Sequence, residues 1–367
     1  MRSKIIIGTI FFIILFGIII IVKKDYSKDK KNVYAILPLT GQSSDMGKTA
    51  MATIDMFMKK YNRGSFNLSI YNSESNPSKA ISVIRQAIVS KGMPEAIIVF
   101  PAYISSAVIP TITEKDIFVF APTSRIPDNS KTREQNNYQT INPLVADIME
   151  PLVKYSANKF KRIAVLYCNE EYGLANEQYF KESIKKQNSM IELVETPFSI
   201  TEDSARDIVS KTVSLNPDAI LVCGTPTRTF ISMFREIANA GYNGTVLSDP
   251  AFSCPFVLSA LGSAADGVIF TCTSADFSDV DINNGREFRE LCIENNITPF
   301  YVPVQVFDTL NIVNMCCQEK IEINRETLAK SNYIGCADPI KFLETGDCSY
   351  PYYLATVKNL RILQIKE

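Results

Sequence analysis

Short apolar runs alternate with helical patterns along most of the chain. In its first half, mainly apolar runs with strand character stand at residues 33–37, 67–71, 96–100 and 117–120. Between these runs, apolar residues recur every three or four positions, the period of an amphipathic helix, at 48–62, 78–91 and 105–113. Strands that alternate with helices through short loops predict βαβ units, and hence a parallel sheet covered on both faces.

A second series with the same alternation begins near residue 144. It predicts strands at 162–167, 218–223, 245–247 and 267–271, and helices at 172–187, 203–215 and 226–240. The last helix has clear end signals, with Thr225 as a cap, Pro226 in the first turn and Gly241 just past the end. Two further helices, at 285–296 and 303–318, precede a closing hairpin at 352–357 and 360–365. The sequence therefore predicts an α/β fold with two Rossmann-like lobes, each built on about four parallel strands.

The N-terminal segment is an almost unbroken apolar run of 18 residues, at 5–22, between basic residues. A run of this length just spans a bilayer. It has neither a small-x-small cleavage site nor the cysteine that follows a lipoprotein signal. Residues 1–32 are therefore predicted to be a membrane anchor followed by a charged linker, with a cleaved signal segment as the alternative. Lysine is more frequent after the run than before it, which by the positive-inside rule favours a cytoplasmic location for the residues after the run. We give the fold more weight than this bias.

Composition excludes several function classes. The formal net charge of −1 and the lack of a basic face argue against nucleic-acid binding. The chain has no histidine, which removes Ser-His-Asp and Cys-His catalysis and the common zinc and iron sites. Neither GxGxxG nor a P-loop occurs. We therefore expect no catalytic residues, no metal and no cofactor, and an α/β enzyme is the weakest alternative.

Cysteine usage is less informative. None of the nine cysteines forms a CxxC pair, so a zinc ribbon or a redox motif is not expected. Cys336 and Cys348 flank a loop, and they either form a disulfide in an oxidising compartment or stay free thiols.

Over residues 33–365, the order of segments resembles the type I periplasmic solute-binding proteins, in particular the branched-chain amino acid group. The loop Pro38-Leu39-Thr40-Gly41, followed by Gly47, is similar to the first strand–turn–helix of that family. Further similar segments are Asn76-Pro77-Ser78-Lys79-Ala80, Ala121-Pro122-Thr123-Ser124, Glu171-Tyr172-Gly173 and Gly346-Asp347.

The resemblance implies an arrangement of the chain. An N-lobe would comprise residues 33–143 and 275–347, and a C-lobe would comprise 144–274 and 348–367. Three crossings between the lobes would form a hinge, and closure would trap a ligand at the carboxyl ends of the strands.

The resemblance also implies ligand-binding residues in the N-lobe. Ser105 and Ser106 would hold a ligand carboxylate together with a helix N-terminus, or would be ordinary helix caps. Thr123, Ser124 and Arg125 follow the fourth strand. Arg125 stands where the family usually has a small polar residue, and it either binds an acidic ligand group or points to solvent.

In the C-lobe, Tyr172 matches an aromatic residue that packs on the ligand. Thr225 and Thr227 lie in a loop of the same kind, where Thr225 is alternatively a cap. Asp249 would pair the ligand ammonium, or would only form an Asp-Pro turn. The neighbouring Glu170 and Glu171 are interpreted as a solvated loop.

One departure from the family pattern carries particular weight. Met46 stands where an aromatic residue is common, although a flexible thioether also suits an apolar pocket. We expect an extracytoplasmic protein of the cell envelope that captures a small amino-acid-like solute for an ABC permease. The alternative is a membrane-tethered sensor of the same fold that signals to a partner protein.

Overall fold

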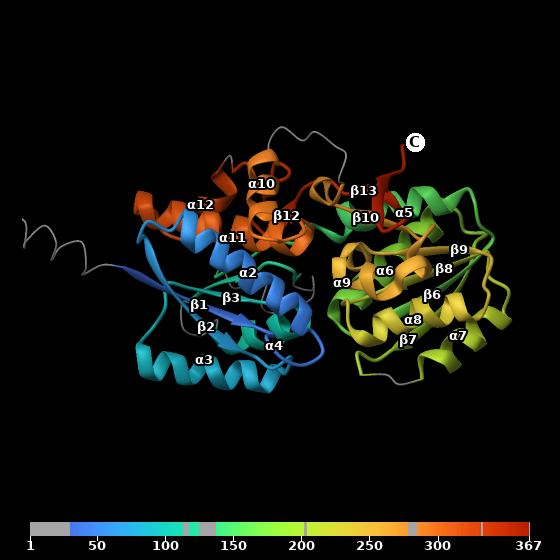
Figure 1. The fold of residues 1–367 in the computed structure, drawn as a ribbon, viewed down its shortest axis with the longest axis horizontal. Coiled ribbons are helices and arrows are strands. Elements are labelled where there is room, and N and C mark those ends of the chain that lie inside the picture. Colours follow the sequence, from blue (N-terminus) through green and yellow to red (C-terminus); the bar gives the residue numbers. More distant parts are fainter. Residues whose placement is uncertain are drawn as a thin grey trace, which may run out of the picture.

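The computed structural model describes residues 30–112, 117–124, 137–201, 204–277, 285–331 and 333–366. The chain forms two lobes side by side, each built around its own sheet (Figure 1). The predicted α/β fold with two mostly parallel lobes is confirmed. The predicted anchor at 5–22 lies outside the described residues. Among the helices of the described ranges, none has the length and hydropathy to span a bilayer.

The N-lobe contains a five-stranded sheet in which all neighbouring strands are parallel. Its order is β2 (Phe66–Asn72), β1 (Lys31–Leu37), β3 (Ala96–Val99), β4 (Phe118–Ala121) and β5 (Tyr138–Thr140). The first four strands along the chain correspond to predicted ones. The fifth, a short strand at the edge, was not predicted.

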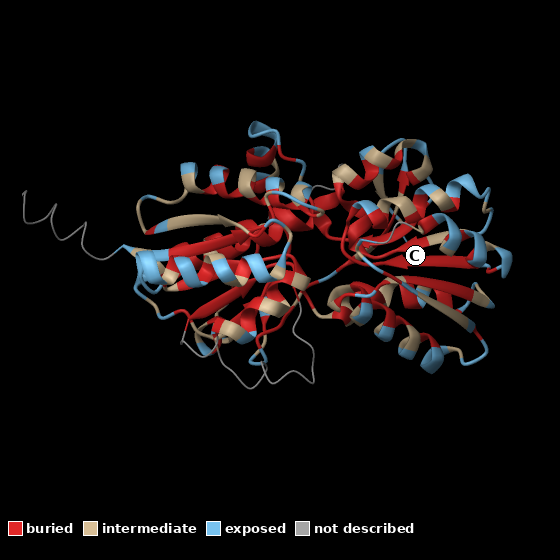
Figure 2. Cartoon of the chain, turned by 90° about the horizontal axis from the view of Figure 1, so that it is seen from below, coloured by how far each residue is buried: buried red, intermediate tan, exposed pale blue. Residues whose placement is uncertain are grey.

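Helices cover both faces of this sheet. The pair α2 (Ser44–Lys60) and α11 (Tyr301–Glu319) packs on one face, and α3 (Pro77–Lys91) with α4 (Ala102–Ile112) on the other (Figure 1). Side chains of a strand alternate between faces, so in β1 the odd residues 33, 35 and 37 join the core under α2, and residues 34 and 36 join the core under α3 and α4. In Figure 2 the buried strands lie inside each lobe and the exposed residues on the outer sides of the helices.

The C-lobe contains a seven-stranded sheet. Five parallel strands are followed by the predicted antiparallel hairpin. In spatial order they are β7 (Glu192–Phe198), β6 (Arg162–Cys168), β8 (Ala219–Cys223), β9 (Thr245–Ser248), β10 (Ile269–Cys272), β13 (Tyr353–Lys358) and β14 (Arg361–Gln364). Two helix pairs accompany this sheet, α5 (Val145–Ala157) with α6 (Glu171–Gln187), and α7 (Ala205–Ser214) with α8 (Arg228–Asn239). The shorter α9 (Pro255–Leu261) packs beside α8.

The chain passes between the two sheets three times, after β5, after β10 and before β13. After the second passage, α10 (Arg286–Glu294) contacts α2 of the N-lobe. The small α12 (Arg325–Lys330) and the two-stranded ribbon β11 (Lys341–Phe342) and β12 (Cys348–Ser349) come next. The ribbon lies beside β5, because the Thr140 N–H donates to the Gly346 carbonyl at 2.9 Å. The residues at which the lobes divide, at 143, 274 and 347, stay a prediction.

A close approach between a helix and the end of the preceding strand occurs once in each lobe, at α2 and at α6. A Cβ on Gly47 of α2 would lie 2.2 Å from the Pro38 carbonyl oxygen, just after β1. A Cβ on Gly173 of α6 would lie 2.3 Å from the Cys168 carbonyl oxygen, at the end of β6. Only glycine allows these contacts, so both helices begin directly on the ends of the strands that precede them.

The long helix α11 is held by a buried carboxylate. Asp308 Oδ1 accepts hydrogen bonds from the Tyr333 hydroxyl and the Cys336 N–H, both at 2.8 Å. Oδ2 is buried and has no hydrogen-bond partner within the described ranges. Burial raises the pKa of Asp308 from its ordinary value to about 7, against the lowering effect of the hydrogen bonds.

Replacing Gly47 by alanine is expected to lower the free energy of unfolding by roughly 1–3 kcal/mol, despite the better helix propensity of alanine, because the new methyl group overlaps backbone atoms. Urea unfolding measures the change. The control is Lys48→Ala at the next, exposed position of α2, which should stay within about 0.5 kcal/mol of the parent. Equal effects of the two substitutions would contradict the close approach.

Asp308→Asn is expected to raise the free energy of unfolding at pH 8 by on the order of 1–3 kcal/mol, because asparagine keeps the Oδ1 acceptor and removes a buried charge. The raised pKa means that the native protein keeps a proton that the unfolded chain releases between about pH 4 and 7. The contribution of Asp308 to stability therefore falls as the pH rises through this range.

The gain from Asp308→Asn should shrink as the pH falls below about 7 and vanish below about pH 4. Urea unfolding at pH 4, 6 and 8 measures it. Asp55→Asn, at an exposed position of α2, should stay within about 0.5 kcal/mol at each pH. A gain that is independent of pH would show that the buried charge is not its cause.

Candidate functional site

A narrow cleft lies between the lobes, at the ends of their strands. Its volume is about 270 Å³, open solvent included. Four residues predicted from the sequence line it, namely Met46, Thr123, Tyr172 and Thr225. The other lining residues are Pro101, Ala102, Asn142, Pro226 and Tyr301. The structure thus brings together residues that are far apart in the chain, from both lobes and from the first crossing.

The N-lobe wall presents unused hydrogen-bonding groups. Thr123 and Asn142 are only 6% and 4% exposed. Thr123 Oγ1 and Asn142 Nδ2 have no hydrogen-bond partner in the described part of the structure, although buried polar groups normally have one. Asn142 is held by its other amide atom, since Oδ1 accepts a hydrogen bond from Gln305 Nε2 at 3.2 Å.

Helix α4 points its N-terminus at the same wall. It begins at Ala102, three residues before the predicted start, and the N–H groups of Ile104 and Ser105 both donate to the Pro101 carbonyl. The first N–H groups of a helix have no partner within the helix, and its dipole favours an anion there. Ala102, rather than Ser105, therefore stands at the helix end that faces the cleft.

The predicted serines support this end of α4 and do not line the cleft. The Ser105 hydroxyl donates to the Val99 carbonyl at 2.8 Å and accepts from the Ser124 hydroxyl at 2.8 Å. The Ser106 hydroxyl donates to the Ala102 carbonyl within the helix, at 3.0 Å. Arg125, the remaining predicted residue of this loop, lies outside the described residues.

The C-lobe wall is built on a buried carboxylate, Glu170, which caps α6. Its Oε2 accepts from the Tyr172 N–H, and its Oε1 from the Gly173 N–H, both at 2.9 Å. Oε1 also accepts from the Thr225 N–H at 3.2 Å. Burial raises the pKa of Glu170, and these hydrogen bonds oppose the rise. The interpretation of Glu170 as part of a solvated loop was wrong, because one of its donors comes from a loop 55 residues away.

Thr225 lines the cleft because it does not cap α8. The cap is Thr227, whose hydroxyl accepts from the Phe230 N–H at 3.3 Å. Helix α8 therefore begins at Arg228, two residues after the predicted start. Thr225 is left in the loop after β8, where its N–H reaches Glu170.

Asp249 lies behind the C-lobe wall and does not line the cleft. Its Oδ2 accepts from Asn176 Nδ2 at 2.9 Å and from the Gly224 N–H at 2.8 Å, and its Oδ1 accepts from the Ala251 N–H at 3.0 Å. Burial raises its pKa to about 7, and the charge of Glu170 adds to the rise. Asp249 thus acts as the turn-forming residue considered as the alternative.

Tyr301 and Asn142 were missed by the sequence analysis. Tyr301 begins α11, and its hydroxyl accepts from the Cys254 thiol of the C-lobe at a sulfur–oxygen distance of 3.5 Å. No local signal marks Tyr301, since only packing brings it to the cleft. For Asn142 a weak signal exists, an Asn-Pro pair just before the predicted start of the second series.

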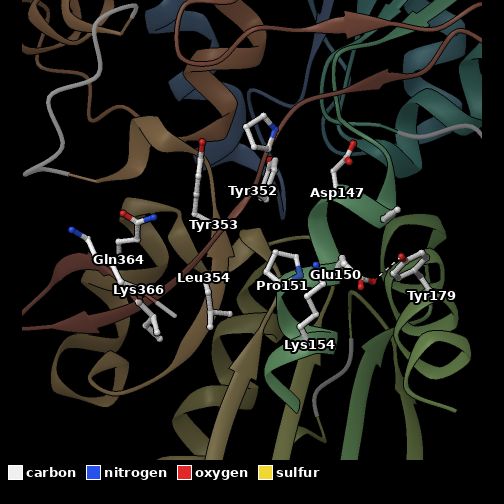
Figure 3. Close-up of a pocket in the computed structure, with 13 residues that line it drawn as sticks. Asp147, Glu150, Pro151, Lys154, Tyr179, Tyr352, Tyr353, Leu354, Gln364 and Lys366 are labelled. Atoms are coloured by element: carbon white, nitrogen blue, oxygen red, sulfur yellow. Dashed lines mark hydrogen bonds between the residues drawn. The ribbon is translucent and has the colours of Figure 1, made fainter. Parts of the chain in front are cut away.

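A second, wider pocket lies in the C-lobe, outside the cleft (Figure 3). It is lined by α5, the third crossing, β13 and the chain end after β14, and its volume of about 1130 Å³ includes open solvent. Tyr179 donates to Glu150 at one side of it, at 3.1 Å. Because no N-lobe helix borders this pocket, lobe closure would not enclose a ligand there.

The described residues contain neither a metal-binding cluster nor a disulfide bond. Among the described residues, no cluster of three or more His, Cys, Asp or Glu side chains could hold a metal ion. All nine cysteines are free thiols, including Cys336 and Cys348.

Comparison with known proteins gives the family. Residues 33–290, more than half of the chain, match the family model described as periplasmic binding protein. No curated protein matches the chain by sequence.

Solved structures share the fold across nearly the whole chain. A leucine-binding protein LivK from Thermotoga maritima is 19% identical, with a TM-score of 0.79 over 92% of this chain and 98% of its own. The LivJ protein of Streptococcus pneumoniae, in complex with isoleucine, is 14% identical, with a TM-score of 0.79 over 91% and 98%. A solute-binding protein of an ABC transporter from Rhodopseudomonas palustris, in complex with 3,4-dihydroxybenzoic acid, is 18% identical, with a TM-score of 0.80 over 92% and 96%.

The structural similarity establishes the fold, while identities below 20% do not identify the solute that this chain binds. The family implies an extracytoplasmic location, and its members are not enzymes, as expected from the sequence. The chain belongs to the periplasmic binding protein family, type I, which consists of solute-binding proteins.

Proposed function

We propose that this protein captures a small amino-acid-like solute in the cleft and delivers it to an ABC transporter. The observation that carries the proposal is the contrast between the two walls. The N-lobe wall offers unpaired polar groups and a helix N-terminus, and the C-lobe wall is backed by two buried carboxylates, Glu170 and Asp249.

A ligand carboxylate fits the N-lobe wall. The first N–H groups of α4, the Thr123 hydroxyl and the Asn142 amide can all donate hydrogen bonds to it, and hydrogen bonds to an ionised group are the stronger kind. Ser105 and Ser124 contribute by fixing the first turn of α4.

A ligand ammonium fits the C-lobe wall. Glu170 and Asp249 each accept three hydrogen bonds from N–H groups, which favour the ionised carboxylates against the effect of burial. The resulting negative charge behind Tyr172 and Thr225 attracts a cation on the cleft side. Met46, Tyr172 and Tyr301 supply apolar surface between the two ends.

The ligands of the two complexed neighbours agree with this arrangement in one respect. Isoleucine and 3,4-dihydroxybenzoic acid both carry a carboxylate, and only isoleucine carries an ammonium group. The buried carboxylates of the C-lobe favour the amino acid over the aromatic acid.

Delivery requires a location beside the transporter. We propose that residues 5–22 anchor the protein to the membrane, since the run is long enough to span it and the family is extracytoplasmic. The three chain crossings would then act as the hinge on which the lobes close. A membrane-tethered sensor would use the same cleft with a different partner.

The test is isothermal titration calorimetry with neutral and acidic amino acids, their amides and aromatic acids. We expect micromolar or tighter binding of at least one amino acid, with a dissociation constant that rises about tenfold in Thr123→Val, because the variant loses one hydrogen bond to an ionised group. Thr123→Val itself should be as stable as the parent, since the lost hydroxyl has no partner in the described structure.

The control is Thr53→Val, a buried threonine of α2 whose hydroxyl is bonded within the helix and which does not line the cleft. Its affinity should stay at the parent value. Failure of every amino acid to bind, with aromatic acids binding instead, would replace the proposed solute class.

A further inference from the structure

Two helix N-termini, those of α4 and α6, meet at the cleft, and the two helices contact each other across the lobes. Each end attracts negative charge through its free N–H groups and its dipole. The first turn of α4 contains no acidic residue. At α6 the equivalent place is taken by the carboxylate of Glu170, which belongs to the protein itself.

We propose that Glu170 is a specificity-determining residue that orients the ligand, because it fills the anion site of α6 and leaves the anion site of α4 to the ligand. The proposal rests on the proposed function. A ligand then binds with its anionic end at α4 and a cationic end toward α6, and a second anionic group is rejected.

The hydrogen bonds of Glu170 support this role. The carboxylate takes up the Tyr172 and Gly173 N–H groups of the first turn, so these two donors are not available to a ligand anion. It also takes up the Thr225 N–H, on the loop that lines the cleft. Three N–H donors of the C-lobe wall are thus used within the protein.

Glutamate is an unusual choice if capping alone were required. Ser, Thr, Asp and Asn are the preferred residues at this position of a helix. The longer side chain of glutamate reaches both α6 and the loop after β8, which places the charge beneath the cleft. Its effect extends across the cleft, since the charge of Glu170 contributes to the raised pKa of Tyr103 on α4, behind the larger effect of burial.

A second carboxylate strengthens the rejection of anions. Asp249 lies close enough for the charge of Glu170 to raise its pKa, after the larger effect of burial. Cys168 beside them also has a raised pKa, caused first by burial and then by both carboxylates. A ligand anion at this wall would be repelled by the negative charge of the carboxylates, while the Tyr172, Gly173 and Thr225 N–H groups are already bonded to Glu170.

The experiment compares Glu170→Gln, which removes the charge, with Glu170→Asp, which keeps a charged cap. Glu182→Gln removes the same charge from an exposed position of α6 and serves as the control. The probes are the amino acid that binds tightest in the panel and its deaminated acid, such as L-leucine with 4-methylpentanoate, together with succinate. Calorimetry at pH 7.5 measures each dissociation constant.

We expect the parent to bind the deaminated acid and succinate at least about 100-fold more weakly than the amino acid, and Glu170→Gln to narrow this ratio about tenfold or more, as expected for one buried charge. Glu170→Asp and Glu182→Gln should keep the parental ratio. A merely structural role would lower the affinity for all probes alike and leave the ratio unchanged.

The outcomes separate the two proposals. If the parent binds no amino acid, the proposed function fails and this inference with it. If amino acids bind but Glu170→Gln leaves the ratio unchanged, only the inference is overturned. If Glu170→Gln does not fold, the test is the ratio of dissociation constants in the parent protein. Equal binding of the amino acid and its deaminated acid by the parent would also overturn the inference.

Discussion

Parallel strand order is the constraint on which the site depends. In a parallel sheet every strand ends at the same edge, so the loops after the strands and the N-termini of the following helices gather there. The chain then passes between the two sheets three times, which turns these two edges toward each other. Met46, Asn142 and Tyr301 share one cleft for this reason, although nothing in their local sequence connects them.

The two lobes repeat one construction with different electrostatics. Gly47 and Gly173 allow the same close contact between a strand end and the next helix, so the geometry of both lobes is alike at this point. The charges differ, because Glu170 neutralises the end of α6 while α4 begins without an acidic residue. The two similar lobes therefore form an electrostatically asymmetric cleft, with hydrogen-bond donors on the N-lobe wall and carboxylates behind the C-lobe wall.

The fold was predictable where the signal is local. Residues 33–37 of β1 and the whole of β8 are continuous apolar runs, and Gly241 marks the end of α8. The start of α8 was predicted two residues too early, because Thr227 and not Thr225 is its cap. Strand β7 was missed because it pairs only with β6 at the edge of the sheet, where half-buried charged residues and Pro197 are tolerated. Helix α5 was missed because Pro151 lies inside it, and packing against α6 outweighs the local preference.

The candidate site was predictable only in part, because some of its residues carry a local sequence signal and others are placed only by packing. Thr123, Tyr172 and Thr225 follow strands, so their place at the cleft could be inferred from the order of elements. Glu170 follows a strand as well, yet an acidic pair in a loop is typical of a solvated surface. Glu170 differs from a surface residue because N–H donors from two separate segments bond to it. Burial of a carboxylate is unfavourable unless such donors compensate for the lost water. Since the convergence of these donors is a property of the packed chain, the charge that makes the cleft asymmetric is visible only in three dimensions.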